Sequence, residues 1–132
     1  MKIHVLRLHP GEDILDSLRT LVNDKAMLAG MIITCVGSLK KIHLRLADEE
    51  YTLEDERKYE ILSLNGTLSK DGPHLHISLS DSKGRVIGGH LLENNIIYTT
   101  AEIIIGEIDD TIFKRILDPK TGFKELNILG NY

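Results

Sequence analysis

Hydrophobic and polar residues alternate with a period of two along most of this chain, which is the pattern of β-strands with one buried face. The pattern predicts strands over residues 2–8, 31–46, 59–68, 96–108, 111–117 and 123–129, and a β-hairpin over residues 74–92. The segment 111–117 also fits a short helix, although we favour a strand. Gly37 and Ser38 interrupt the second strand and indicate a bulge or a bend. Residues 48–57 are rich in acidic side chains and are expected to form a solvated loop.

One segment follows the period of an α-helix instead. Its apolar residues recur at intervals that place them on one face of a helix. They are Ile14, Leu15, Leu18, Leu21 and Val22. Glu12 and Asp13 precede this stripe, where acidic side chains favour a helix N-terminus, and Gly30 is expected to end the helix. Strands recur at hairpin spacing rather than alternating with helices, which argues against a parallel doubly wound sheet. The sequence therefore predicts a single α+β domain over residues 1–132, with a mostly antiparallel sheet and one main helix packed on it.

The predicted hairpin carries three histidines, and its register decides whether they meet. His74 and His76 are two residues apart in an extended strand, so their side chains point to the same face. The turn Asp81-Ser82-Lys83-Gly84 fits a three-residue hairpin loop, with Asp at its first position and glycine where φ is positive. Counting outward from this loop places His76 opposite His90. A loop of two or four residues would turn His90 to the other face.

In this register the three imidazoles are close enough to bind one metal ion. Directly opposed side chains have Cβ atoms about 4.5–5.5 Å apart, and diagonal ones about 7–8 Å. Neutral imidazole suits Zn²⁺, Cu²⁺, Ni²⁺ and Fe²⁺, so we expect a divalent transition metal, with zinc the first choice, on His74, His76 and His90. A His-X-His pair on a strand is also a common surface pair, and that alternative stays open. The remaining histidines are expected to be ordinary surface or loop residues: His4, His9 and His43.

Composition and charge indicate which kinds of binding partner and which compartment to expect. The chain has 20 acidic and 16 basic residues and a formal net charge of −4, so it offers no basic field for nucleic acid. Its one cysteine, Cys35, lies in an apolar run and is expected to be a buried small hydrophobe. One cysteine forms no disulfide within the chain, so a reducing cytoplasm is the expected compartment. No apolar run approaches the ~20 residues of a membrane helix, and the N-terminus lacks the pattern of a signal peptide, so we expect no membrane association.

Five segments stand out in combination along nearly the whole chain. They are residues 7–13 before the helix, 37–39, 59–66, the histidine hairpin with its Gly88-Gly89-His90, and 113–115. Together they resemble the plants-and-prokaryotes conserved domain, or PPC domain. The resemblance implies a compact α+β fold that assembles as a homotrimer. For prokaryotic members it also implies a metal site on three histidines, which match His74, His76 and His90 here. In plants the domain is joined to AT-hook segments that bind A·T-rich minor grooves, so single-domain relatives are associated with DNA.

This chain departs from the plant pattern in its charge. An AT-hook needs an Arg-Gly-Arg core, and the sequence contains none. Lys40 and Lys41 are the nearest approach to a basic cluster, whereas residues 48–56 are strongly acidic. We therefore expect DNA to be bound only weakly or through a partner protein.

Three functions are compatible with these patterns. The first, which we favour, is a homotrimeric module that holds a metal and has a DNA-associated or regulatory role. The second is a metal-dependent enzyme of hydrolase or lyase type, with a small-molecule ligand at the metal. Its general base would be Glu102 or Glu60, although each also fits a salt-bridged core or interface carboxylate. The third is a purely structural metal. We expect no organic cofactor, since Gly88 and Gly89 lack the helix and lysine of a phosphate loop and indicate a bulge or a close approach of another backbone.

Overall fold

The structure is a computed structural model, and it describes residues 1–47 and 50–130. Within these ranges it has nine strands and one helix, in the order β1 (Lys2–Leu8), α1 (Ile14–Asp24), β2 (Gly30–Arg45), β3 (Thr52–Asp55), β4 (Tyr59–Leu68), β5 (His74–Ser80), β6 (Val86–Leu91), β7 (Ile96–Glu107), β8 (Thr111–Leu117) and β9 (Lys124–Gly130). All of these strands pair antiparallel. The predicted α+β fold, a mostly antiparallel sheet with one main helix, is confirmed.

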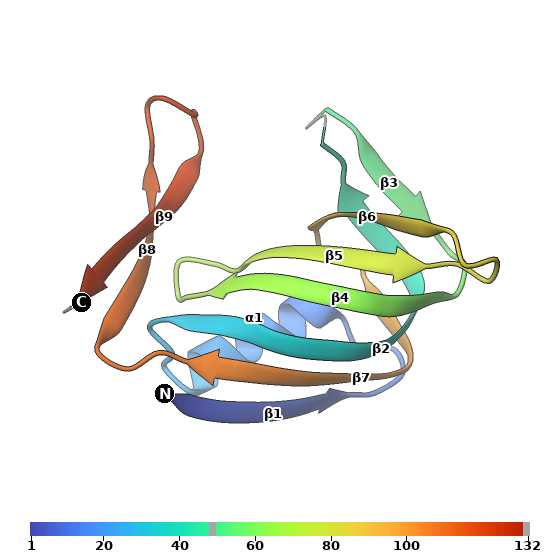
Figure 1. Cartoon of the computed structure of the whole chain (residues 1–132), viewed down its shortest axis with the longest axis horizontal. Coiled ribbons are helices and arrows are strands. Elements are labelled where there is room, and N and C mark those ends of the chain that lie inside the picture. The colour runs from blue at the N-terminus through green and yellow to red at the C-terminus, as the bar shows by residue number, and fades with distance from the viewer. Residues whose placement is uncertain (48–49, 131–132) are drawn as a thin grey trace.

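Seven of the strands form one sheet that curls and closes on itself (Figure 1). The order is β1-β7-β2-β4-β5-β6, with β3 paired to β2, and β6 returns to the end of β2, where Arg45 lies opposite His90. β2 reaches so many neighbours because it is 16 residues long and shifts its register after Gly37. A Cβ at Gly37 would lie 2.1 Å from the carbonyl oxygen of Thr100, so only glycine permits this close approach. The predicted irregularity at this position is therefore confirmed.

The helix ends earlier than its sequence pattern predicts. Ala26 adopts a positive φ of 51°, and the N–H of Met27 donates to the carbonyl of Val22 at 2.9 Å. The hydrogen bond gives a partner to a carbonyl group of the last helical turn, and the positive φ of Ala26 ends the helical path of the chain. Our expectation that Gly30 ends the helix is wrong, because Gly30 is already the first residue of β2. α1 is 11 residues long, and the described part of the chain contains no helix long and apolar enough to cross a membrane.

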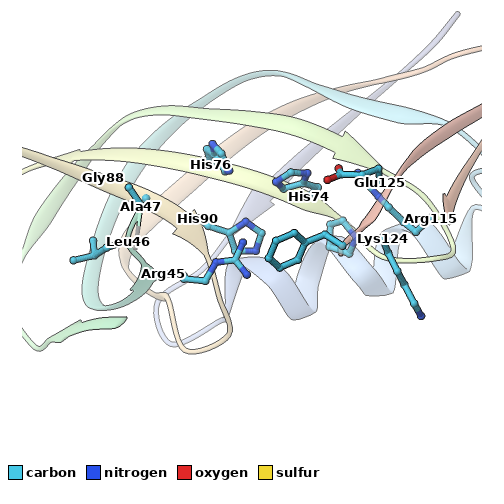
Figure 2. Close-up of a pocket in the computed structure, with 13 residues that line it drawn as sticks. Arg45, Leu46, Ala47, His74, His76, Gly88, His90, Arg115, Lys124 and Glu125 are labelled. Carbon is cyan, nitrogen blue, oxygen red and sulfur yellow. The ribbon is translucent and has the colours of Figure 1, made fainter. Parts of the chain in front are cut away.

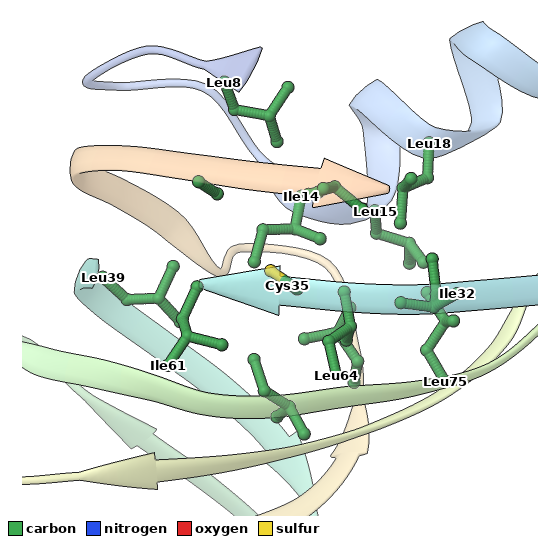
Figure 3. Close-up of a cluster of buried hydrophobic side chains, with 14 of the residues drawn as sticks. Leu8, Ile14, Leu15, Leu18, Ile32, Cys35, Leu39, Ile61, Leu64 and Leu75 are labelled. Atoms are coloured by element: carbon green, nitrogen blue, oxygen red, sulfur yellow. The ribbon is translucent and has the colours of Figure 1, made fainter. Parts of the chain in front are cut away.

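The core lies between α1 and the inner face of the sheet (Figure 3). The helix buries most of its apolar stripe: Ile14, Leu15, Leu18 and Val22. The sheet contributes side chains such as Leu39, Ile61 and Leu75. Cys35 belongs to this core at 3% exposure, and burial raises the pKa of its thiol to about 12. It is therefore the buried small hydrophobe that the sequence predicts, with a thiol that stays protonated at neutral pH.

The acidic segment 48–57 contains a strand that its composition does not predict. Thr52–Asp55 form β3, which pairs with the end of β2, so the expected loop is wrong over these four residues. Leu53 packs against the core from this strand, and one inward apolar side chain between exposed neighbours suffices for an edge strand. Residues 48 and 49, which also belong to the expected loop, lie outside the described ranges.

β8 and β9 form a separate two-stranded sheet, which we call the C-terminal hairpin (residues 111–130). Its first strand confirms the strand favoured over residues 111–117. In Figure 1 the hairpin stands apart from the main sheet, near the loop that joins β4 and β5. The buried Phe113 anchors it, with its N–H donating to the carbonyl of Leu28 at 3.0 Å. The N–H of Arg115 donates to the Asp71 carboxylate at 3.0 Å, so the hairpin is tied to that loop as well.

Candidate metal centre

The turn that joins β5 and β6 has the predicted length. The N–H of Asp81 donates to the carbonyl of Arg85 at 3.0 Å, and the N–H of Gly84 donates to the carbonyl of Asp81 at 3.0 Å. Gly84 has the expected positive φ, 77°. The Asp81 carboxylate also accepts the N–H of Arg85, which fixes the loop further. These contacts set the register in which His76 lies opposite His90, as the sequence predicts.

Three imidazoles lie together on the face of β5 and β6 that points away from the core. The ring centroid of His74 is 5.1 Å from those of His76 and His90, and the latter two are 5.6 Å apart. One ring nitrogen from each residue lies within 4.8 Å of the other two. Leu75 and Ile77 alternate with the histidines along β5 and are buried. β5 therefore supplies core residues on one face and two of the three histidines on the other, and His90 comes from β6.

The imidazoles line a pocket of about 660 Å³, shown in Figure 2. Its other walls come from the end of β2, from β6 and from the C-terminal hairpin. The charged side chains in its lining are Arg45, Arg115, Lys124 and Glu125. A Cβ at Gly89 would lie 2.6 Å from the carbonyl oxygen of Arg45, and one at Gly88 would lie 2.5 Å from that of Ile77. The close backbone approach expected at these two glycines is confirmed.

Burial and neighbouring positive charge keep two of the imidazoles neutral. Burial, followed by the charge of Arg45, lowers the pKa of His90 from 6.5 to about 4. Burial also lowers the pKa of His74, and Arg115 acts in the same direction, while Glu125 opposes them. Neutral imidazole is the form that binds transition metals, so both rings are ready to act as ligands at neutral pH.

The donor atoms of this cluster fit a transition metal. The Nδ1 atom of His90 is buried and has no hydrogen-bond partner among the described residues. Buried polar atoms in folded proteins are rarely left unpartnered. An imidazole nitrogen of this kind beside two further imidazoles is the donor set that zinc and its neighbours prefer. The residues that would hold the ion are His74, His76 and His90.

We expect the metal-free protein to lose stability as the pH falls from 6.5 towards 4. The unfolded chain protonates His90 near its ordinary pKa of 6.5, whereas the folded protein keeps this ring neutral down to about 4. The unfolded state then binds more protons, so the free energy of unfolding decreases over this range. Thermal unfolding with chelator present, at about pH 7 and about pH 5, measures the effect. The difference in Tm should shrink in His90→Gln, and an unchanged difference would contradict the lowered pKa.

The two acids predicted as candidate bases do not line the histidine pocket. Glu60 lies on β4 and Glu102 on β7, opposite Arg7 of β1, and both side chains are exposed. The acid that lines the pocket in the described chain is Glu125, from the C-terminal hairpin. A catalytic role for Glu60 or Glu102 stays a prediction, while Glu125 is the acid that lines this pocket among the described residues.

The other histidines lie outside the cluster. His4 shares a hydrogen bond of 2.8 Å with the Glu107 carboxylate, and Nδ1 of His43 contacts the carbonyl oxygen of Glu93 at 3.0 Å. His9 is exposed. None of the three joins the group that could hold a metal in the described residues.

Known proteins resemble this chain over most of its length. A family model for the Plants and Prokaryotes Conserved (PCC) domain matches residues 1–109. The bifunctional protein GlmU of Synechococcus sp. (strain JA-2-3B'a(2-13)) is 42% identical over 128 residues, which cover 97% of this chain and 20% of that protein. AT-hook motif nuclear-localized protein 13 of Arabidopsis thaliana is 29% identical over 115 residues, covering 78% of this chain and 26% of that protein. The chain thus spans a fifth to about a quarter of the length of these relatives.

Solved structures match the whole fold, including the C-terminal hairpin. A hypothetical protein from Salmonella cholerae-suis (Salmonella enterica) is 36% identical, with a TM-score of 0.95, and the match covers 99% of this chain and 95% of that one. A metal-containing protein from Archaeoglobus fulgidus is 27% identical, with a TM-score of 0.80 and coverage of 96% and 94%. Because the family model matches most of its length, and the Salmonella protein nearly all of it, this chain belongs to the Plants and Prokaryotes Conserved domain family, the PPC family that its sequence resembles.

Proposed function

We propose that this protein is a homotrimeric PPC-domain module that binds one divalent transition metal, zinc in the first place, through His74, His76 and His90. We also propose that this module has a DNA-associated or regulatory role. The observation that carries it is the convergence of three imidazole nitrogens within 4.8 Å of one another. The similarity to an archaeal protein described as metal-containing supports the metal-binding part of the proposal.

The residues around the cluster have separate tasks in this proposal. Pairing of β5 with β6 holds His76 and His90 opposite each other, and His74 completes the set from the same strand as His76. A bound divalent ion would act there as a Lewis acid towards a further ligand. The protein keeps the three rings close, holds His74 and His90 neutral by lowering the pKa of each, and leaves the pocket beside them for that ligand.

Metal analysis of protein purified without a histidine tag tests the proposal. We expect about one transition ion per chain, loss of the ion on treatment with chelator, and recovery on addition of zinc. A metal content near zero both before and after addition of zinc would contradict the proposal.

The pocket itself favours a second candidate, a metal-dependent enzyme that acts on a small molecule. Its volume of about 660 Å³ lies within the usual range of small-molecule sites. A screen for hydrolase or lyase activity, with and without chelator, distinguishes the candidates. Turnover that chelator abolishes and zinc restores would support the enzyme, whereas stoichiometric metal without turnover would favour the regulatory module or a structural metal.

We expect the protein to be a homotrimer in dilute solution. Large apolar side chains are exposed on the outer face of β1 and β2, with Val5 at 77%, Val36 at 54% and Ile33 at 48%. A sheet face of this kind usually forms an interface, and the number three comes from the family. Light scattering at micromolar concentration should return three times the chain mass of 14.8 kDa. Val5→Asp should reduce that mass, and a monomeric wild-type protein would rule the trimer out.

We expect the purified chain to bind duplex DNA weakly or not at all. Affinity for the phosphate backbone requires basic side chains that release counterions, and this chain carries a net charge of −4. The basic element would then come from a partner protein or from a longer protein that contains the domain. Fluorescence anisotropy with A·T-rich and G·C-rich duplexes at physiological salt measures the affinity. Sub-micromolar, sequence-selective binding would contradict this expectation.

A further inference from the structure

We propose that the histidine pocket binds a small organic anion, whose carboxylate or phosphate group is held by Arg45 and Arg115. The inference rests on the proposed metal site for the location of the ligand, and it adds the chemical class of that ligand. It also assigns the C-terminal hairpin a role, since this segment supplies one of the two arginines.

Arg45 reaches the pocket because the sheet closes on itself. The end of β2 pairs with β6, and in that register Arg45 lies directly opposite His90. Figure 2 shows its guanidinium group beside the His90 ring, and both residues line the pocket. In the described chain the arginines that form ion pairs are Arg19 and Arg57. The charge of Arg45 therefore has no carboxylate partner there.

Arg115 lines the pocket from β8 of the C-terminal hairpin. Its backbone is tied to Asp71, and one terminal nitrogen of its side chain donates to the Thr67 hydroxyl at 2.6 Å. The same guanidinium has a buried Nε with no hydrogen-bond partner among the described residues. Arg115 lines the pocket and forms no ion pair among the described residues, so its guanidinium, held in place by Thr67, can donate to a carboxylate or phosphate there.

The remaining charges select the kind of anion. Lys124 adds a third positive charge to the lining, and Glu125 adds one negative charge. Three cations against one carboxylate favour an anion over a neutral or cationic ligand. Glu125 repels a second anionic group on its own side and can accept a hydrogen bond from a hydroxyl or amino group of the ligand. A small carboxylate or phosphate with such a polar substituent fits these groups.

The two halves of the pocket come from different parts of the chain. All three histidines and Arg45 lie within residues 1–109, which match the family model. Arg115, Lys124 and Glu125 follow that range and belong to the C-terminal hairpin. A change in the hairpin can thus alter which ligand is bound and leave the histidine cluster as it is.

Isothermal titration calorimetry at constant ionic strength tests the inference, on both metal-free and zinc-loaded protein. The probes are glycolate, inorganic phosphate and the neutral analogue glycolamide. We expect one of the two anions to bind at about one per chain, and glycolamide not to bind. Tighter binding of glycolate assigns the site to a carboxylate, and tighter binding of phosphate assigns it to a phosphate ligand. Absence of binding by both anions would overturn the inference.

Variants identify the groups responsible. Arg45→Gln and Arg115→Gln should each lower the affinity for the anion at least about tenfold, because a charged hydrogen-bond partner is lost. Arg85→Gln removes the same charge from the exposed turn and should leave the affinity unchanged. Arg115→Lys keeps the charge and should lose less affinity for the anion than Arg115→Gln. Thermal unfolding shows whether each variant is folded. Wild-type affinity in both folded glutamine variants would overturn the inference.

Metal content of the same samples separates this inference from the proposed metal site. Metal bound without any anion binding would overturn the inference alone. Anion binding by the metal-free protein that depends on the two arginines would support the inference even if metal analysis fails.

Discussion

Replacement of His76 by alanine should abolish stoichiometric metal binding and leave the fold intact. The His76 side chain is exposed, so its removal costs little packing, yet it supplies one of three imidazoles in the cluster. Loss of an outer partner of a metal ligand typically costs 10–100-fold in affinity, and loss of a ligand itself should cost more than about a hundredfold. Metal content after dialysis against buffer measures the loss, and circular dichroism confirms the fold.

His43→Ala is the matched control for this variant. His43 is a histidine of the same sheet, but it hydrogen-bonds to the carbonyl of Glu93 and lies outside the cluster. The His43→Ala variant should retain about one metal ion per chain. If His76→Ala retains as much metal as His43→Ala, the assignment of the ligands is wrong.

A second large effect is expected from Gly66→Ala, which should destabilise the protein by about 3 kcal/mol or more. Gly66 has a φ of +142°, and a Cβ there would lie 1.9 Å from the carbonyl oxygen of His74 on the neighbouring strand. The clash is with backbone, so β4 and β5 must separate to relieve it. Urea unfolding measures the loss of stability, and metal affinity should fall with it because His74 is displaced.

Gly72→Ala separates this clash from the strain of the backbone itself. Gly72 also has a positive φ, +118°, but no atom lies within 4 Å of the position of its Cβ. Its cost should be limited to about 1–2 kcal/mol of conformational strain. Equal losses in the two variants would show that the close approach at His74 does not limit stability.

The histidine cluster could be predicted from sequence because every determinant is local. Asp81 and Gly84 specify the length of the loop, and that length specifies which residues face each other. The alternation of Leu75 and Ile77 with the histidines then specifies the face. No contact from elsewhere in the chain is needed to place His90 opposite His76.

The rest of the pocket could not be predicted, because it depends on contacts between distant segments. Arg45 reaches the histidines only when β2 pairs with β6, and Arg115 only when the C-terminal hairpin docks near Asp71. Arg45 lies in none of the segments that carry the family resemblance, and Arg115, although it lies in the segment 113–115, is not marked there as a site residue. The helix end was missed for a related reason, since Ala26 occupies a left-handed conformation that normally indicates glycine.

The closeness of the three histidines in the chain has a consequence for the order of folding. They lie on one hairpin, between residues 74 and 90, and hairpins of this size close within about 1–10 microseconds. Arg45 and Arg115 must instead wait for pairings across long stretches of chain, which form more slowly. The imidazoles can therefore meet while the nascent chain is still incomplete, before residues 111–130 have left the ribosome. A metal ion captured at that stage would hold β5 and β6 in register while the remaining strands assemble around them.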